Sequence, residues 1–183
     1  MCLQLLGREY YQGPLTEPLL LFIPLGIHMT SGVVRRILLG WPKRPTLLQA
    51  TAYTTLVALP IHIAIHRLIP STPTPPISAL SPSELNYEFV KAGFTYWPGL
   101  SWVVYSGLVG IVIVHAGEGA RIIVRALTGK SLSKKWTRGV SAVVWSAVMG
   151  GLYWISREPL ELRGGQLGRV MAVYGASGLY KVG

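Results

Sequence analysis

The sequence predicts an all-α protein, an integral membrane helical bundle with four spanning helices. Its 183 residues are 50% hydrophobic and 13% charged, whereas about 25% of residues are charged in an ordinary soluble domain. The charged residues are also grouped, so that four intervals of 17, 22, 26 and 18 residues contain none. A helix needs about 20 mostly apolar residues to cross a membrane. Four such intervals in succession are hard to reconcile with a soluble protein of this size.

The spans are expected to begin and end near prolines. Pro18 suits the first turn of a helix, where no amide partner is required. Pro42 would end the same helix beside Trp41, a residue type that favours the lipid headgroup region. Pro70 would end the second span. The spans form a membrane domain over residues 1–160, at about 18–39, 47–69, 97–127 and 140–156.

Two segments are expected outside the membrane. Residues 70–94 form the longest loop, which opens with a proline-rich run over 70–76. Such a run cannot continue a helix and favours an extended polyproline conformation. We predict that Pro73 and Pro75 contact a partner, because a preformed extended segment binds at low entropy cost; the simpler alternative is a stiff spacer. The glycine-rich tail, 161–183, is expected to lie on the surface or to be disordered.

The first residues are apolar and resemble the end of a helix. We therefore expect a further helix to precede them in the natural protein, which would give a five-helix protein. The segment lacks the layout of a secretory signal peptide, and the single cysteine, Cys2, permits no internal disulfide.

The positive charges fall mainly on one side of the predicted membrane. Four alternating spans place the loops after the first and third spans together, and the other side carries seven cations against six acids. In a bacterial or inner mitochondrial membrane the basic side would face the cytoplasm or matrix, and its charge could also attract anionic lipid headgroups. Because this charge borders membrane spans, no nucleic-acid partner is expected. Both termini are predicted on the less basic side. The ten cations of the basic side are Arg35, Arg36, Lys43, Arg44, Arg121, Arg125, Lys130, Lys134, Lys135 and Arg138.

The first and third spans share a pattern that points to haem. Each has a histidine after an apolar run, a glycine four residues later and an arginine close behind. Positions i and i+4 share a helix face, so the glycine opens space beside the histidine for a flat macrocycle. Histidine is the usual axial ligand of haem iron, and the arginine could reach a haem propionate. The alternative is that each histidine bonds a neighbouring backbone carbonyl. The predicted haem b site comprises His28, His115, Gly32, Gly119, Arg35 and Arg121.

The remaining histidines, His62 and His66, lie one turn apart on the second span. That spacing could bind a metal on one helix face. No acid or cysteine completes a site there, so no metal beyond haem iron is predicted. Either histidine could instead replace one member of the first pair as a haem ligand.

The element His115-x-x-x-Gly119-x-Arg121 resembles the haem-binding helix of the cytochrome b membrane subunits of succinate dehydrogenase and fumarate reductase. In the first copy, Arg35 lies one residue later than the spacing of that family. More closely, most of the chain is similar to the membrane domain of fungal mitochondrial adapter proteins related to those cytochromes. The resembling segments are residues 8–12, 28–36, 62–70 and 97–121.

This resemblance implies a fold like that of complex II membrane anchors, in a mitochondrial and specifically an outer membrane. It also implies a role in lipid homeostasis and the recruitment of a bridge-like lipid-transfer protein. Members of the adapter family have an additional helix before the segment that resembles residues 8–12, and a cytosolic Pro-x-Pro recruitment segment near their N-terminus. Here the sequence Pro73-Thr74-Pro75 lies in an internal loop instead.

Three functions are compatible with these features. The first is a membrane adapter in the mitochondrial outer membrane that could carry haem b. The second is the haem b anchor subunit of a succinate dehydrogenase-type, quinone-linked electron-transfer complex. A small transporter is disfavoured, because no acid lies within the apolar runs and Glu118, at the edge of a span, is the only candidate. The sequence contains no nucleophile–base pair or phosphate-binding loop, so we do not expect an enzyme acting on its own.

Overall fold

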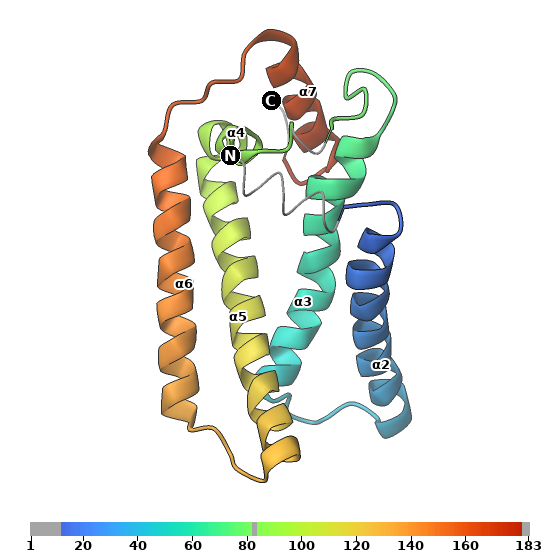
Figure 1. The fold of residues 1–183 in the computed structure, drawn as a ribbon, viewed down its shortest axis with the longest axis vertical. Helices are drawn as coiled ribbons and strands as arrows, with labels where there is room; N and C mark the ends of the chain where they lie inside the picture. Colours follow the sequence, from blue (N-terminus) through green and yellow to red (C-terminus); the bar gives the residue numbers. More distant parts are fainter. Residues whose placement is uncertain (1–11, 82–83, 181–183) are drawn as a thin grey trace. The chain divides into compact units, whose positions relative to one another are not determined.

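The computed structural model describes residues 12–81 and 84–180, and it divides the chain into two compact units, Met1–Pro45 and Thr46–Gly183. The described residues form helices and no strand (Figure 1). Four helices are long and apolar enough to cross a membrane: Pro18–Leu39, Leu47–Ser71, Pro98–Thr128 and Lys134–Arg157. The predicted all-α membrane bundle is therefore confirmed, and the chain is a multi-pass membrane protein.

The described residues of the first unit, 12–45, contain one spanning helix. A π-helical turn, Pro18–Phe22, continues directly into α2, Ile23–Leu39. The helix ends at Gly40, whose φ of 74° lies in the left-handed region that favours glycine.

Three spanning helices form the body of the second unit. The first is α3, Leu47–Ile63, which continues through a π-helical turn, Ala64–Leu68, and a short 3-10 turn, Ile69–Ser71. The other two are α5, Pro98–Thr128, and α6, Lys134–Arg157. In sequence order they run in alternating directions, and α5 packs against both α3 and α6.

Local sequence explains where these helices begin and end. Thr46 and Gln49 form a capping box at the start of α3, each side chain accepting a hydrogen bond from the other's backbone amide. Pro98 occupies the first turn of α5, where its missing N–H costs nothing. At the other end of α5, Gly129 adopts a left-handed conformation, with a φ of 71°, and its amide donates to the Arg125 carbonyl oxygen.

Helices α5 and α6 approach closely at a glycine. A Cβ atom added to Gly117 would lie 3.0 Å from both Ser141 Oγ and Thr137 Cγ2. Close packing of this kind is how small residues hold helices together in lipid. Further along, a Cβ at Gly110 would lie 3.3 Å from Trp145 Nε1.

Most large side chains of the spans point away from the rest of the protein. Val103, Leu127 and Val143 are 70%, 80% and 69% exposed. A soluble protein rarely shows so much contiguous apolar surface, but in a bilayer this surface faces lipid tails.

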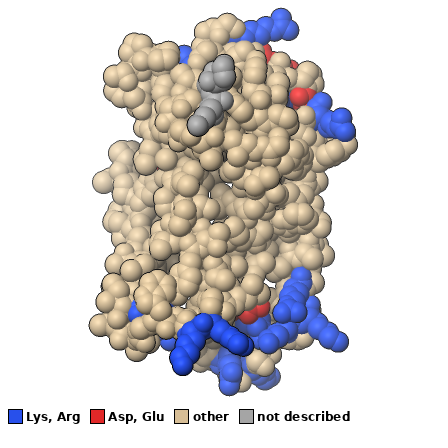
Figure 2. All heavy atoms as spheres, turned by 180° about the vertical axis from the view of Figure 1, so that it is seen from behind, with Lys and Arg blue, Asp and Glu red and all other residues tan. Residues whose placement is uncertain are grey.

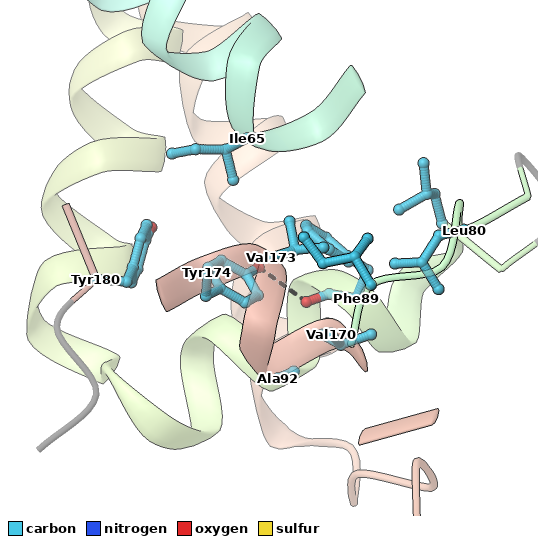
Figure 3. Close-up of a cluster of buried hydrophobic side chains, with 10 residues drawn as sticks. Ile65, Leu80, Phe89, Ala92, Val170, Val173, Tyr174 and Tyr180 are labelled. Atoms are coloured by element: carbon cyan, nitrogen blue, oxygen red, sulfur yellow. Dashed lines mark hydrogen bonds between the residues drawn. The ribbon is translucent and has the colours of Figure 1, made fainter. Parts of the chain in front are cut away.

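The buried apolar core lies at one end of the second unit, in a part that we call the head, residues 70–97 and 158–180. It contains two further helices, α4, Tyr87–Tyr96, and α7, Gly164–Ala176. The ten core residues come from the π-helical turn after α3 and from the head: Ile65, Ile77, Leu80, Leu85, Phe89, Ala92, Val170, Val173, Tyr174 and Tyr180. Figure 3 labels eight of them, all but Ile77 and Leu85.

The head corrects two predictions. Residues 70–94 are not only a loop, because they contain most of α4. The tail is neither disordered nor merely lying on the surface, because it forms α7 and buries Val170, Val173 and Tyr174. These three residues follow the i, i+3, i+4 spacing of an apolar helix face, and the glycines around them obscured it.

Charge separates the two ends of the second unit. In Figure 2, Lys and Arg side chains gather near the helix ends and leave an uncharged band between them. The end opposite the head carries six cations and Glu118: Arg121, Arg125, Lys130, Lys134, Lys135 and Arg138. In the head, Lys91 and Arg169 are instead paired with glutamates.

Cysteine labelling should place the head and the α5–α6 loop on opposite sides of the membrane. In a Cys2→Ser background, an impermeant maleimide should label Ser78→Cys from one side, and Thr128→Cys and Lys43→Cys from the other. The reason is that one span, α3, connects residue 43 to residue 78, and one span, α5, connects residue 78 to residue 128. Labelling of Ser78→Cys and Thr128→Cys from the same side would disprove this topology.

Candidate partner-binding and haem sites

The proline-rich run forms a closed turn on the surface of the head. The amides of Ala79 and Leu80 donate to the carbonyl oxygens of Thr72 and Pro70, at 2.7 and 2.8 Å. The predicted extended polyproline conformation is therefore wrong, because these bonds fold the run back on itself.

The turn exposes the two prolines that are predicted to contact a partner. Pro73 and Pro75 are exposed, whereas Pro70 and Ile77 on either side of them are buried. Ile77 belongs to the apolar core of the head. Both ends of the turn are thus fixed, and the exposed prolines project from a rigid base.

Arg169 of α7 holds this turn in place. Its Nε donates to the Ile77 carbonyl oxygen at 2.8 Å, and a second nitrogen donates to the Ser78 carbonyl oxygen at 3.2 Å. A third nitrogen pairs with Glu84 at 2.6 Å. Ser78 and Ala79 have φ angles of 54° and 48°, a left-handed conformation that is uncommon for residues other than glycine. Arg169 therefore stabilises a strained segment that lies 91 and 92 positions before it in the sequence.

Lys91 joins α4 to the segment between α6 and α7. Its Nζ lies 2.6 Å from Glu88 and 2.9 Å from Glu158, and its side chain is only 8% exposed. The hydrogen bonds to Glu88 and Glu158 raise the pKa of Lys91. Burial alone would raise the pKa of Glu88, but hydrogen bonds from Lys91 and from the Glu161 amide outweigh it and lower that pKa. These charges stabilise the head and have no visible catalytic arrangement.

His115 contacts α3 within the second unit. Its Nδ1 lies 3.5 Å from Thr51 Oγ1, a long hydrogen bond. The Thr51 hydroxyl also donates to the carbonyl oxygens of Leu47 and Leu48, at 2.9 and 3.0 Å. Donor and acceptor roles in this contact depend on the imidazole tautomer. If Nδ1 carries the proton and donates to Thr51, the lone pair lies on Nε2, an arrangement that is usual for a metal-ligating histidine.

The other predicted haem ligand, His28, lies on α2 in the first unit, where its carbonyl oxygen accepts a hydrogen bond from Ser31 Oγ at 3.0 Å. The two histidines thus belong to units that are described separately. Their coordination of a single iron stays a prediction.

The glycines and arginines of the motif differ in their surroundings. A Cβ added at Gly32 or Gly119 would meet no other atom within 4 Å, so space is open beside each glycine. Arg35 is exposed on α2. Arg121 instead pairs with Glu118, 2.7 Å away on the preceding turn of α5. To pair with Arg121, a haem propionate would have to share this arginine with Glu118 or displace Glu118 from it.

His62 and His66 pack within the second unit. Their ring centroids are 4.4 Å apart, and His66 Nε2 lies 3.1 Å from the Tyr105 hydroxyl oxygen. The His66 ring also meets the edge of Phe89 at 5.2 Å. In the part of the chain that the structure describes, no group of three or more His, Cys, Asp or Glu residues gathers as a metal site. Coordination of haem by His66 Nε2 would break its bond to Tyr105.

Comparisons with known proteins found no match for the chain. No protein-family model matches the chain, and searches of curated proteins and of solved structures found no match. Most of the resembling segment at residues 8–12 lies outside the described residues. The other three resembling segments lie on α2, on the end of α3 with the two turns that follow it, and on α5 with the residue before it.

Sequence reasoning missed three residues that shape these sites. Arg169 was counted only as a charge, and Thr51 and Tyr105 were not singled out. A local signal existed for Thr51 and Tyr105, because each lies on an apolar span where a hydroxyl needs a partner. The bonds of Arg169 and Tyr105 join residues 39 to 92 positions apart, and no spacing rule predicts them.

Proposed function

We propose that the chain is a mitochondrial membrane adapter that binds a protein partner through the exposed turn containing Pro73 and Pro75. The observation that carries the proposal is this turn, which is exposed at its tip and fixed at both ends by the head. A rigid, displayed segment loses little entropy when it binds. The protein has no catalytic role of its own in this proposal.

The resemblance to fungal mitochondrial adapters supplies the cellular setting of the proposal. It supports a place in the outer membrane, a role in lipid homeostasis and a bridge-like lipid-transfer protein as the partner. Pro73-Thr74-Pro75 would then act as the Pro-x-Pro recruitment segment from an internal loop. Because the turn is closed, the partner would recognise a folded corner of the head.

The double variant Pro73→Ala/Pro75→Ala should bind a purified bridge-like lipid-transfer protein at least about tenfold more weakly, since each truncated contact at the centre of an interface costs about 1 kcal/mol or more. The measurement is the dissociation constant by biolayer interferometry, with the full chain in nanodiscs. Pro159→Ala is the matched control, because Pro159 is an exposed proline of the head outside the turn. Equal binding by wild type and the double variant would show that the two prolines do not contact the partner and that the turn is only a spacer.

The second candidate function is that of a haem b anchor subunit in a quinone-linked complex of the succinate dehydrogenase type. The observation that favours it is the Thr51–His115 contact, which would leave the lone pair on Nε2 of His115 when the ring donates from Nδ1. With the open space beside Gly119, the residues around His115 fit one axial position of a haem. Haem bound there would add one-electron chemistry, and it is equally compatible with a structural role in the adapter.

A further inference from the structure

An open cavity of about 620 Å³ lies at the basic end of the second unit, where α3 begins and α5 ends. Its volume is in the range of small-molecule and lipid headgroup sites. The start of α3 supplies apolar walls through Leu47 and Leu48, and α5 supplies Ile122 and Ala126. The site thus combines apolar walls with a charged end.

Two arginines line this cavity. Arg121 and Arg125 are one helical turn apart on α5, on the same face. Glu118 also lines the cavity and pairs with Arg121 at 2.7 Å. Among the described residues, the Arg125 side chain has no hydrogen bond or ion pair. Two guanidinium groups against one carboxylate leave a net positive charge, which favours an anion.

The cavity lies at the depth where a lipid headgroup would lie. Both its arginines are near the end of a spanning helix, and the neighbouring Ile122 and Ile123 are 58% and 59% exposed. Cations at this position of a spanning helix meet lipid phosphates. A planar guanidinium can donate two parallel hydrogen bonds to one phosphate.

An apolar groove adjoins the cavity. It has a volume of about 500 Å³ between α5 and α6, and it shares Leu47 and Glu118 with the cavity. Ile113, Val114 and Trp145 line it further into the span. A groove with these walls fits an acyl chain that descends from a headgroup in the cavity.

We propose that the cavity binds the headgroup phosphate of one anionic phospholipid, whose acyl chain follows the groove between α5 and α6. The net positive charge selects an anionic lipid over a zwitterionic one, because a choline group would add a second cation beside Arg125. This proposal is independent of the adapter function, but its cavity shares Arg121 with the predicted haem site, so the test is made at Arg125. Arg125 belongs to neither the proline turn nor the predicted haem site.

Native mass spectrometry of the full chain in detergent tests the proposal with phosphatidylglycerol as the probe. We expect one phosphatidylglycerol to bind, and phosphatidylcholine to bind more weakly. Arg125→Gln should weaken phosphatidylglycerol binding about tenfold, as expected for loss of a charged hydrogen-bond partner. Ala126→Trp should weaken it as well, by filling the cavity without changing a charge.

Lys135→Gln is the matched control, because Lys135 is exposed at the same end of the second unit but does not line the cavity. It removes the same charge and should leave phosphatidylglycerol binding unchanged. An equal loss in Lys135→Gln and Arg125→Gln would overturn the proposal in favour of general charge attraction. Equal affinity for phosphatidylcholine would also overturn it. Unchanged phosphatidylglycerol binding in Ala126→Trp would place the lipid outside this cavity and would also overturn the proposal.

Discussion

Replacing Tyr174 with alanine should release α7 from the head and destabilise the second unit by about 3–5 kcal/mol, the usual cost of removing a buried aromatic ring. Tyr174 is 0% exposed, and its ring stacks on Phe89 with centroids 4.8 Å apart. Its hydroxyl donates to the Phe89 carbonyl oxygen at 2.9 Å, the bond drawn in Figure 3. Burial raises the pKa of this hydroxyl, so it remains a donor at neutral pH. The measurements are the thermal unfolding midpoint in detergent and protease cleavage between α6 and α7.

Two controls separate the ring from its hydroxyl and from nonspecific effects. Tyr174→Phe keeps the ring and should cost only about 1 kcal/mol, the net value of a typical hydrogen bond. Tyr153→Ala removes a tyrosine of α6 that is 52% exposed, and it should change the midpoint little. If Tyr174→Ala unfolds at the same temperature as Tyr153→Ala, the head does not depend on α7.

Replacing His28 or His115 with alanine should abolish the absorption spectrum of a six-coordinate, low-spin haem b. We predict that the two imidazoles are the axial ligands of one iron, because their motifs repeat on the first and third spans of the sequence. Gly32 and Gly119 would make room for the porphyrin, and Arg35 and Arg121 would lie near its propionates. The measurement is the Soret and α-band spectrum of the purified full chain produced with haem available.

The other two histidines provide the control. His62→Ala and His66→Ala should keep the haem spectrum, although His66→Ala also loses the bond to Tyr105. A wild-type protein without a Soret band would refute haem binding and leave His28 and His115 as packing residues. If the Soret band were lost in His66→Ala but not in His28→Ala, the protein would still bind haem, but His66 would replace His28 as the ligand.

The spans could be predicted because a membrane-spanning helix needs a long run of apolar residues, and such a run is visible in the sequence itself. A charge-free interval of sufficient length can be recognised without knowledge of distant residues, and Pro70 marks the end of the second span just as locally. The start of α3 at Thr46 and Gln49 follows from an equally local signal.

The head could not be predicted in the same way. Helix α7 contains glycines at 164, 165, 168 and 175, each of which lowers intrinsic helix propensity by about 1 kcal/mol relative to alanine. Its stability comes from burial of Val173 and Tyr174 against α4, a contact between segments some 85 positions apart. The closed shape of the proline turn has the same origin, because Arg169 fixes it from α7. Within the predicted haem site, the Thr51–His115 contact also joins residues 64 positions apart.

The ion pair between Lys91 and Glu158 has a consequence for the order of assembly. Ribosomes make α4 before α5 and α6, but Lys91 gains Glu158, and Phe89 gains Tyr174, only after those two helices have been synthesised. During insertion, α4 therefore presents an apolar face and an incompletely paired lysine on its side of the membrane. Folding of the head marks the point at which all three spans of the second unit are in place, and a chain stalled before α7 exposes a surface that chaperones and proteases recognise.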